Sequence, residues 1–447
     1  MEETAATAGA TAGATAAGVA AGVAAAGVAG GSRVRLRRLC ERRDGNGWVI
    51  GRIETGDFIS VSEVAHRVIT LLGQGLAVGE VAARLRAETG TAFAVADFVA
   101  ALDELGFIAA VDDRDRADHA RPGPSLPWLR PGHVRWLLHP LTAVVVAGFA
   151  VSAAVMLALH PALLPGYRVL VWSQRAGLVL AVNAAIAWTI LLVHELAHLA
   201  TARAAGAPAR ITLSTRLQFL VAQTDVSGVW AAPRRTRMTV YLAGMSIDVC
   251  SAGACLLILG LAEPHGLARS VLASAVALAL LTLPIQFMVF MRTDIYFVLQ
   301  DLTGCANLYA DGTAYLRYLG RWLARHVRHA DGPNPDPSRA YSRRQRRAVR
   351  GYSAVLLAGT AICLAAEFAV SLPALITLLI RAVSEIGGSL PATLDGGVAL
   401  AILLTWQILW ASRWWHRHRH QVRPIPRHHL RASRREVNGH GTDLRGA

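Results

Sequence analysis

The sequence predicts a polytopic α-helical membrane protein with about six transmembrane helices and a small N-terminal α+β, winged-helix-like domain. Three observations predict this fold class. Hydrophobic residues fill 53% of the 447 positions and charged residues only 17%, whereas about a quarter of a soluble domain is charged. Six apolar stretches are long enough to cross about 30 Å of hydrocarbon. All 45 basic residues are arginine, and they concentrate between alternate stretches, as in oriented membrane proteins.

The N-terminal part of the chain is predicted to be soluble. Residues 1–32 repeat Ala, Gly, Thr and Val, which is typical of a disordered low-complexity tail. In 33–112, two strand-like runs, 48–53 and 58–61, precede three segments with helical periodicity. The spacing of Ser60-Val-Ser-Glu63 predicts a capping box at the first of these helices. We therefore expect a hairpin followed by three short helices.

A charged, proline-containing linker, 113–136, leads into the apolar part of the chain. The predicted spans are 141–159, 176–193, 238–262, 271–291, 353–380 and 396–412. They form a four-span core, 137–320, and two further transmembrane helices, 352–412. A basic cytoplasmic loop, 321–351, separates the two groups, and a basic cytoplasmic tail, 413–447, follows them.

The arginines orient these spans. With the N-terminal domain in the cytoplasm, the inside segments hold 25 arginines and the outside loops hold four. The positive-inside rule then makes the chain a multi-pass plasma-membrane protein with both termini cytoplasmic. The basic run Arg343–Arg347 lies directly before a span, where positive charge contacts anionic lipid. We expect a lipid bilayer and no nucleic acid among the partners, and an arginine-rich, lysine-free chain indicates a bacterial source.

A metal-binding motif ends the second predicted span. His194-Glu195-Leu196-Ala197-His198 has the form HExxH. Positions i and i+4 of a helix share a face, so both imidazoles can reach one ion, and Glu195 can act on its water. Zinc requires such neutral nitrogen ligands, a third ligand and one open position. Because ionisable groups in an apolar span are expensive and usually functional, the motif predicts a Zn²⁺ site.

The third ligand must come from elsewhere in the chain, because no further histidine follows at a suitable spacing. Three acids lie within or at the end of the predicted spans: Asp248, Asp294 and Glu367. Asp294 follows the fourth span on the cytoplasmic side, at a depth similar to that of His198, and is favoured. Asp248 would hold the second nitrogen of a ligand histidine or be satisfied by a neighbouring helix. Glu367 lies too deep.

These residues resemble the site-2 protease family of intramembrane zinc metalloproteases, most closely its bacterial branch of peptide zinc metalloproteases. The likeness covers roughly residues 135–320. Besides HELAH, it includes Thr224-Asp-Val-Ser227 with Trp230, Arg237 before Leu242-Ala-Gly244, Asp294 with Tyr296, and Asp301-Leu302 before Asn307-Leu308. Residues 137–320 would then form a transmembrane metalloprotease core.

The resemblance also implies residue roles. The zinc ligands it implies are His194, His198 and Asp294, with Glu195 as the catalytic base. The candidates to support them are Asp248, Asp225 and Asp301. The implied enzyme is a zinc metalloendopeptidase. It would hydrolyse a peptide bond of a peptide or membrane-associated substrate, such as a ribosomally made modified peptide, at the cytoplasmic face.

Two departures from that family support an alternative. The family has Asn-Pro shortly before the aspartate and Gly after it, whereas this chain has Met288-Val289 and Ile295. The resemblance implies that Asn-Pro opens the helix and helps to seat substrate. The alternative is a catalytically weak or inactive membrane peptide-binding or export partner in peptide maturation. A transporter is disfavoured, because the sequence has no inverted repeat or paired broken helices.

Two segments predict how a peptide would be held. Residues 97–107, Asp-Phe-Val-Ala-Ala-Leu-Asp-Glu-Leu-Gly-Phe, resemble the end of a PqqD-like domain. That resemblance implies that 33–112 binds a leader peptide by adding it as a strand to a sheet edge. The segment 211–229, between the second and third spans, is rich in β-forming residues. It is expected to form a hairpin at the membrane surface that pins an extended substrate.

Overall fold

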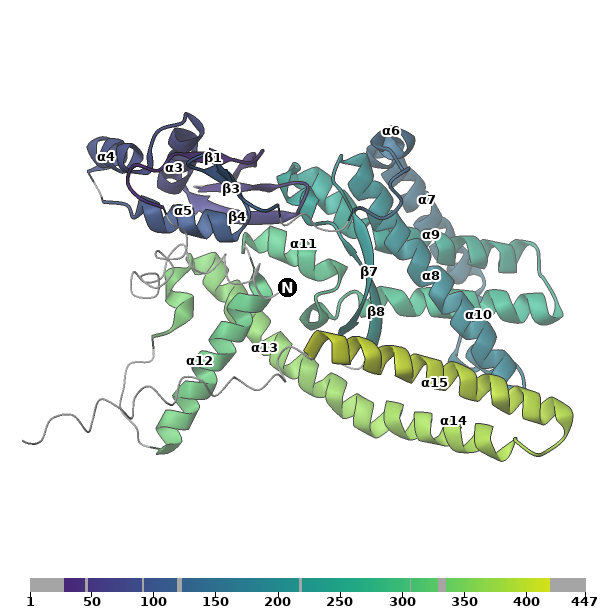
Figure 1. Cartoon of the computed structure of the whole chain (residues 1–447). Coiled ribbons are helices and arrows are strands. Elements are labelled where there is room, and N and C mark those ends of the chain that lie inside the picture. The colour runs from purple at the N-terminus through teal and green to yellow at the C-terminus, as the bar shows by residue number, and fades with distance from the viewer. Residues whose placement is uncertain are drawn as a thin grey trace, which may run out of the picture.

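The computed structural model describes residues 28–44, 47–90, 92–118, 123–216, 219–305, 307–328 and 335–418. These residues form a mixed α/β domain near the N-terminus and a larger helical body (Figure 1). Most of the two predicted tails, residues 1–27 and 419–447, lies outside the described residues.

The N-terminal domain contains two three-stranded antiparallel sheets and three helices. One sheet has the order β1 (Val34–Leu36), β5 (Ile108–Val111), β6 (Arg114–Asp115), and the other β2 (Cys40–Asp44), β3 (Gly47–Arg52), β4 (Asp57–Ser62). The helices are α3 (Glu63–Gly73), α4 (Val78–Thr89) and α5 (Val95–Glu104). Fully buried Ile50, Val68, Leu85 and Leu102 join sheet and helices in one core. The predicted hairpin and helices are present. The first sheet was not predicted, because its short strands are distant in sequence.

The cap of α3 differs from the sequence prediction. Ser62 is the N-cap, and its hydroxyl accepts a hydrogen bond from the backbone N–H of Ala65 at 3.3 Å. Ser60 instead lies inside β4, opposite Val49 of β3. The capping box predicted at Ser60 and Glu63 is therefore wrong, because strand pairing continues through Ser60 and delays the start of the helix.

Six helices of the described chain are long and apolar enough to cross a membrane, as predicted. They are α7 (Pro140–Leu159), α8 (Ala176–Ala204), α9 (Arg234–Leu261), α10 (Gly266–Ile285), the continuous helix 343–384, and α15 (Leu390–His418). The continuous helix comprises α13 (Arg343–Ala366), a π-helical turn (Glu367–Ser371) and α14 (Leu372–Ser384). No residue of α7 is buried, so the body presents a broad apolar surface.

Several helix boundaries differ from the predicted spans, and two of them bear on the site. Helix α8 continues beyond the predicted end at Val193 to Ala204, so that HExxH lies within a regular helix. The fourth span ends at Ile285 rather than Met291, with Pro284 in its last turn. Proline has no N–H to donate to the carbonyl four residues earlier, which weakens the last turn of α10. A short 3₁₀ turn, Val289–Met291, leads from there towards the site.

Helix α8 is surrounded by the other elements of the body. Helices α9 and α10 pack on it, and α15 lies along it in Figure 1. The rings of Trp188 and Trp406 are 5.8 Å apart at the contact with α15. At the start of α8, the N–H groups of Gly177 and Leu178 donate hydrogen bonds of 2.9 and 3.0 Å to the Asp395 carboxylate of α15. The helix that carries HExxH is thus packed between α9 and α10 on one side and α15 on the other.

The segments between the long helices are also ordered. The predicted hairpin in 211–229 is present as β7 (Arg210–Arg216) paired antiparallel with β8 (Phe219–Asp225). A 3₁₀ turn, Ser227–Ala231, follows it and contacts the N-terminal domain, where Arg42 Nε donates to the Trp230 carbonyl at 3.0 Å. Helices α11 (Asp294–Thr303) and α12 (Leu308–Arg328) precede α13. The stretch 321–351, predicted as a loop, therefore holds the end of α12 and the start of α13.

Candidate metal centre

Helix α8 presents both histidines of HExxH to one buried point. His194 and His198 are 5% and 6% exposed, and their Nε2 atoms lie 3.2 Å apart. This separation follows from helix geometry, because residues four apart lie on the same face. The spacing within α8 thus brings both side chains to one face of the helix.

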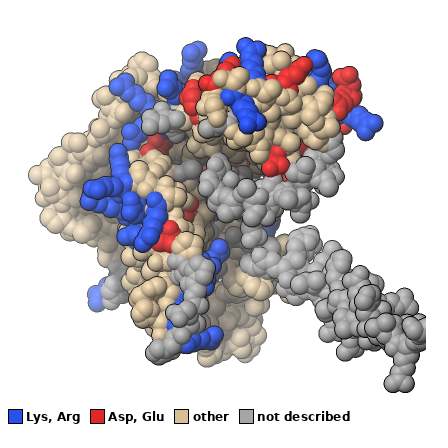
Figure 2. Space-filling model, turned by 90° about the vertical axis from the view of Figure 1, so that its left-hand side faces the viewer, with Lys and Arg blue, Asp and Glu red and all other residues tan. Residues whose placement is uncertain are grey.

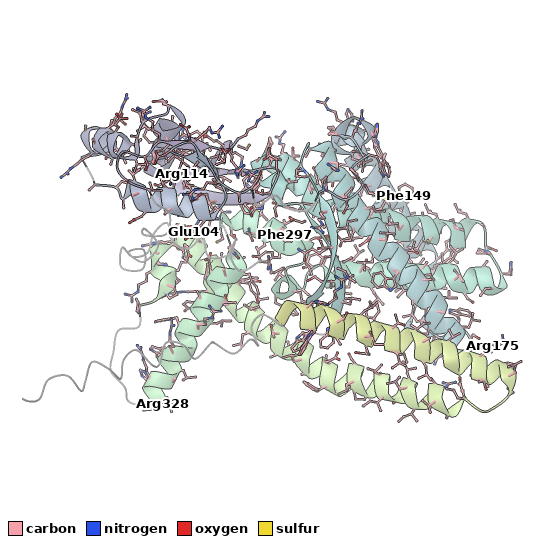
Figure 3. The ribbon with its side chains drawn as sticks, in the orientation of Figure 1. Glu104, Arg114, Phe149, Arg175, Phe297 and Arg328 are labelled. Carbon is pink, nitrogen blue, oxygen red and sulfur yellow. The ribbon has the colours of Figure 1, made fainter. Side chains whose placement is uncertain are left out.

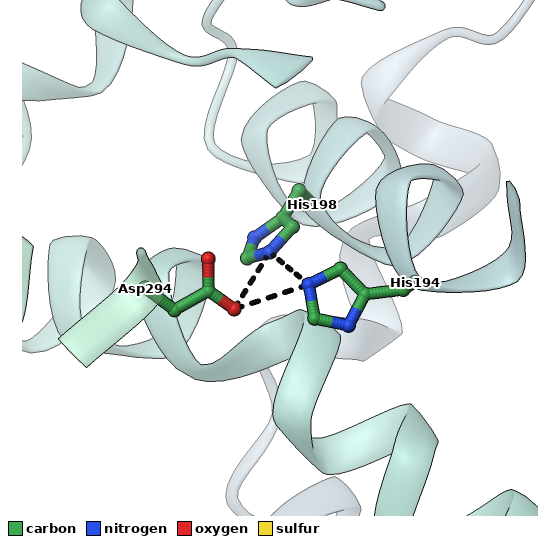
Figure 4. Close-up of side chains that lie close together, drawn as sticks. All are labelled: His194, His198 and Asp294. Atoms are coloured by element: carbon green, nitrogen blue, oxygen red, sulfur yellow. Dashed lines mark hydrogen bonds and ion pairs between the residues drawn. The ribbon is translucent and has the colours of Figure 1, made fainter. Parts of the chain in front are cut away.

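Asp294 completes the group from the first turn of α11. Its Oδ2 lies 3.1 Å from the Nε2 atoms of both His194 and His198 (Figure 4). The preceding turn is held to the end of α10, because Thr293 Oγ1 donates to the Gln286 carbonyl at 2.6 Å. The Asp294 N–H in turn donates to Gln286 Oε1 at 3.3 Å. The broken connection after α10 therefore delivers the carboxylate to the histidines.

The three atoms fit a tetrahedral metal ion. Zinc–ligand distances of about 2.0–2.2 Å place the ligand atoms of a tetrahedron roughly 3.3–3.6 Å apart. The observed separations of 3.1 and 3.2 Å are close to this range. One carboxylate oxygen and two imidazole nitrogens are also a donor set that zinc accepts, with a fourth position left for water.

Hydrogen bonds on the far side of each imidazole set its tautomer. His198 Nδ1 lies 2.8 Å from the Val240 carbonyl, which can only accept, so Nδ1 carries the proton. His194 Nδ1 lies 2.9 Å from Asp248 Oδ2. Asp248 is 1% exposed and also accepts a hydrogen bond from Thr282 Oγ1 at 3.0 Å. Both Nε2 atoms consequently direct lone pairs at the shared point, as metal ligands must.

Glu195 is positioned by the hairpin. Thr224, near the end of β8, donates from Oγ1 to Glu195 Oε2 at 2.6 Å, and the same hydroxyl lies 3.1 Å from the Glu195 carbonyl. Both residues are buried, at 7% and 9% exposure. The bond holds one carboxylate oxygen and leaves Oε1 for a proton. Glu195 can therefore act as a base beside the His-His-Asp group.

Helix α9 approaches the ligand atoms so closely that it requires a glycine. A Cβ at Gly244 would meet Nε2 of His194 and Nε2 of His198. The helix backbone therefore forms one wall of the site. The sequence showed Gly244 only as part of a short motif, and it gave no sign of this contact, nor of the roles of Thr224, Val240 and Thr282.

The other two predicted supporting acids make different contacts. Asp225 Oδ1 accepts hydrogen bonds from the N–H and Oγ of Ser227, at 3.0 and 2.5 Å. Asp301 binds Arg237 through two hydrogen bonds of 2.6 and 2.9 Å, and this pair joins α11 to α9. Of the three candidates, Asp248 forms a hydrogen bond with one of the two HExxH histidines. Asp225 and Asp301 instead stabilise the elements around the site.

Helix α11 is anchored on its other side by aromatic residues. Tyr296 is 1% exposed, and its Oη accepts a hydrogen bond from the Tyr309 N–H at 3.0 Å. Burial raises the pKa of the Tyr296 phenol to about 12, so the group stays neutral. Tyr352 of α13 donates from Oη to the Val289 carbonyl at 3.2 Å. These contacts fix the segment that carries Asp294.

The fold and site together define a helical protein with six membrane-length helices and a His-His-Asp cluster, with both histidines buried, beside a glutamate. Comparison of the chain with protein-family models, curated proteins and solved structures found no match.

Proposed function

We propose that this protein is a membrane-embedded zinc metalloendopeptidase that hydrolyses a peptide bond of a peptide or membrane-associated substrate at the cytoplasmic face. One observation carries the proposal. Asp294 Oδ2 lies 3.1 Å from the Nε2 atoms of both HExxH histidines, and the motif glutamate is held beside them by Thr224. A His-His-Asp set with an adjacent base suits metal-assisted hydrolysis.

The membrane placement supports the cytoplasmic assignment. Six helices are long and apolar enough to span a bilayer, and the arginine distribution orients both termini to the cytoplasm of a bacterial plasma membrane. Figure 2 shows arginines spread over the end of the molecule that would face the cytoplasm. HExxH lies near the corresponding end of α8, which continues only to Ala204. A substrate would therefore reach the site from the cytoplasm or the inner leaflet.

The proposed mechanism assigns proton transfer to Glu195. A zinc ion held by His194, His198 and Asp294 would supply Lewis acidity and a water of lowered pKa. Glu195 Oε1 would take the proton of the attacking water, while Thr224 holds Oε2 in place. The same carboxyl would then give the proton to the leaving amine nitrogen.

The hairpin is the proposed guide for substrate. A carbonyl inside a helix is shielded, so the scissile segment must be extended. The β7–β8 sheet has two strands in the described chain, which leaves an edge of β8 for an added strand. Because Thr224 of β8 contacts Glu195 directly, a strand added there would lead to the base. The N-terminal domain packs on the turn after β8, so a leader peptide bound by that domain would lie near this edge.

Glu195→Gln tests the proposal. The amide is isosteric and cannot accept the proton, so the purified full chain should keep one zinc per molecule and lose hydrolysis of fluorescent casein by about 10³-fold. Glu104→Gln, at an exposed position in the N-terminal domain (Figure 3), is the matched control and should retain activity. Unchanged hydrolysis in Glu195→Gln would refute the proposal that the protein is a metallopeptidase with Glu195 as its base. Zinc without hydrolysis in the unaltered chain would favour the peptide-binding or export alternative.

A further inference from the structure

Helix α12 has an apolar face that other described residues cover over only half of its length. Near its start, Leu308 and Gly312 are buried against α11 and α13. The same face continues through the second half at helical spacing. There the exposed fractions are 37% for Leu319, 46% for Trp322, 58% for Leu323 and 71% for Val327. Large apolar side chains on one continuous face need a covering partner.

The contacts of α12 place it at the level where α13 becomes apolar. The Gly312 carbonyl accepts a hydrogen bond from Ser353 Oγ at 3.1 Å, and a Cβ at Gly312 would meet the Tyr352 ring. The last arginine of α13 is Arg350, and no charged residue follows it until Glu367. The inner half of α12 is therefore attached where α13 would enter hydrocarbon.

The direction of α12 suits a helix that lies along a membrane surface. In Figure 1 it runs across the direction of α14 and α15 rather than beside them. Its far end, marked by Arg328 in Figure 3, extends away from the body. It is also not one of the six helices that are both long and apolar enough to cross a membrane. An amphipathic helix at this depth would present one face to lipid and the other to water.

The positive charge of the outer half of α12 indicates that its lipid partner is anionic. Arg317, Arg321 and Arg328 are exposed on the side away from the apolar face, and Arg325 lies at its border. The acid in α12, Asp311, is in the first turn and accepts a hydrogen bond from Tyr341 at 2.8 Å. Clustered arginines beside exposed apolar residues complement anionic headgroups. Trp322 is the kind of side chain that favours the interface.

We propose that the outer half of α12, residues 317–328, is an interfacial helix that inserts its apolar face into the cytoplasmic leaflet and binds anionic phospholipid. This inference rests on the membrane placement in the proposed function, but not on zinc or hydrolysis. The Tyr309 N–H, near the start of α12, donates a hydrogen bond to Tyr296 of α11. The lipid-binding helix is therefore in direct contact with the helix that carries Asp294.

Adjacent positions on opposite faces provide the test. In a full-length variant whose five cysteines are replaced, Leu323→Cys and Ala324→Cys would each carry a bimane fluorophore in phosphatidylcholine vesicles. Nitroxide-labelled lipid should quench the label at 323 and leave that at 324 unquenched. Phosphatidylglycerol at about 30% should raise the quenching at 323 about twofold.

A charge variant separates lipid attraction from apolar insertion. Replacing Arg317, Arg321 and Arg328 with Gln should abolish the phosphatidylglycerol effect at 323. The matched control removes three exposed arginines of the N-terminal domain, Arg43, Arg86 and Arg114, and should leave the effect intact.

Three results would overturn the inference. Equal quenching at 323 and 324 would refute an oriented helix. Quenching at 323 that does not change with phosphatidylglycerol content would refute recognition of anionic lipid. A label at 323 that is shielded from water but not quenched by lipid would show that a protein surface covers this face. Release of the whole chain by alkaline carbonate would instead refute the membrane placement itself.

Discussion

At the residue scale, the site depends on how closely α9 approaches the two imidazoles. Gly244 is the residue of α9 whose absent side chain makes room for both Nε2 atoms. Four residues further along the same helix, Asp248 bonds His194 Nδ1, and Val240 bonds His198 Nδ1 one turn earlier. A single helix thus sets the orientation of both ligands and limits the space around them.

Gly244→Ala should therefore destroy metal binding. The new methyl group would occupy the space of the two Nε2 atoms, and in a packed helix the backbone cannot move away without strain. We expect the zinc content of the purified chain to fall by about tenfold, measured by atomic emission. Gly148→Ala on α7, where a Cβ meets nothing within 4 Å, should bind zinc normally. Full zinc occupancy in Gly244→Ala would contradict the geometry.

At the element scale, two pieces of structure must meet α8 for the site to form. The hairpin brings Thr224 to Glu195, and α11 brings Asp294 to the histidines. Helix α11 is attached to α9 by Arg237 and Asp301, whose side chains are 5% and 10% exposed. A buried, bidentate pair of this kind leaves an uncompensated charge when one partner is removed.

Arg237→Ala should consequently loosen α11 from α9. We expect the free energy of unfolding in detergent to fall by about 3 kcal/mol, because Asp301 would remain buried without its main partner. Arg234 approaches the same carboxylate at 3.4 Å but its side chain is 54% exposed. Arg234→Ala should lower stability by less than about 1 kcal/mol. Denaturant titration of the two variants compares them, and equal losses would show that burial of the pair is unimportant.

At the scale of the whole molecule, the apolar surface and the arginine distribution support the proposed orientation in the membrane. In the proposed topology, the six helices that are long and apolar enough to cross a membrane return the chain to the side on which it began. The loop between α9 and α10 and the segment before α13 then lie on opposite sides of the bilayer. The same proposed topology places HExxH, Asp294 and the N-terminal domain on one side.

Single cysteines test that orientation in an otherwise cysteine-free chain. His265→Cys, in the exposed α9–α10 loop, should react with a membrane-impermeant maleimide in intact cells, because the positive-inside rule puts this loop outside. Ala340→Cys, exposed before α13, should react only after permeabilisation. The reverse pattern would invert the topology and move the proposed site to the other side of the membrane.

How much the sequence could predict depended on whether a feature is local. The HExxH pair is a property of one helix, so spacing alone was sufficient to place both imidazoles together. The six long helices also follow from continuous apolar stretches. By contrast, the cap at Ser62 was missed, since it depends on strand pairing with β3. The end of α10 at Ile285 was missed because the uncharged apolar stretch continues to Met291.

The sequence by itself determined the number of membrane-length helices and the helical pair of histidines, and it favoured Asp294 as the third ligand from its place after the fourth predicted span. These features arise from hydrophobic periodicity and helix spacing, which are short-range. Only the tertiary structure decided that Asp294 reaches both nitrogens, that Thr224 holds Glu195, and that Gly244 leaves them room. Those contacts join elements far apart in the chain, and close packing between helices sets them to within a few tenths of an ångström.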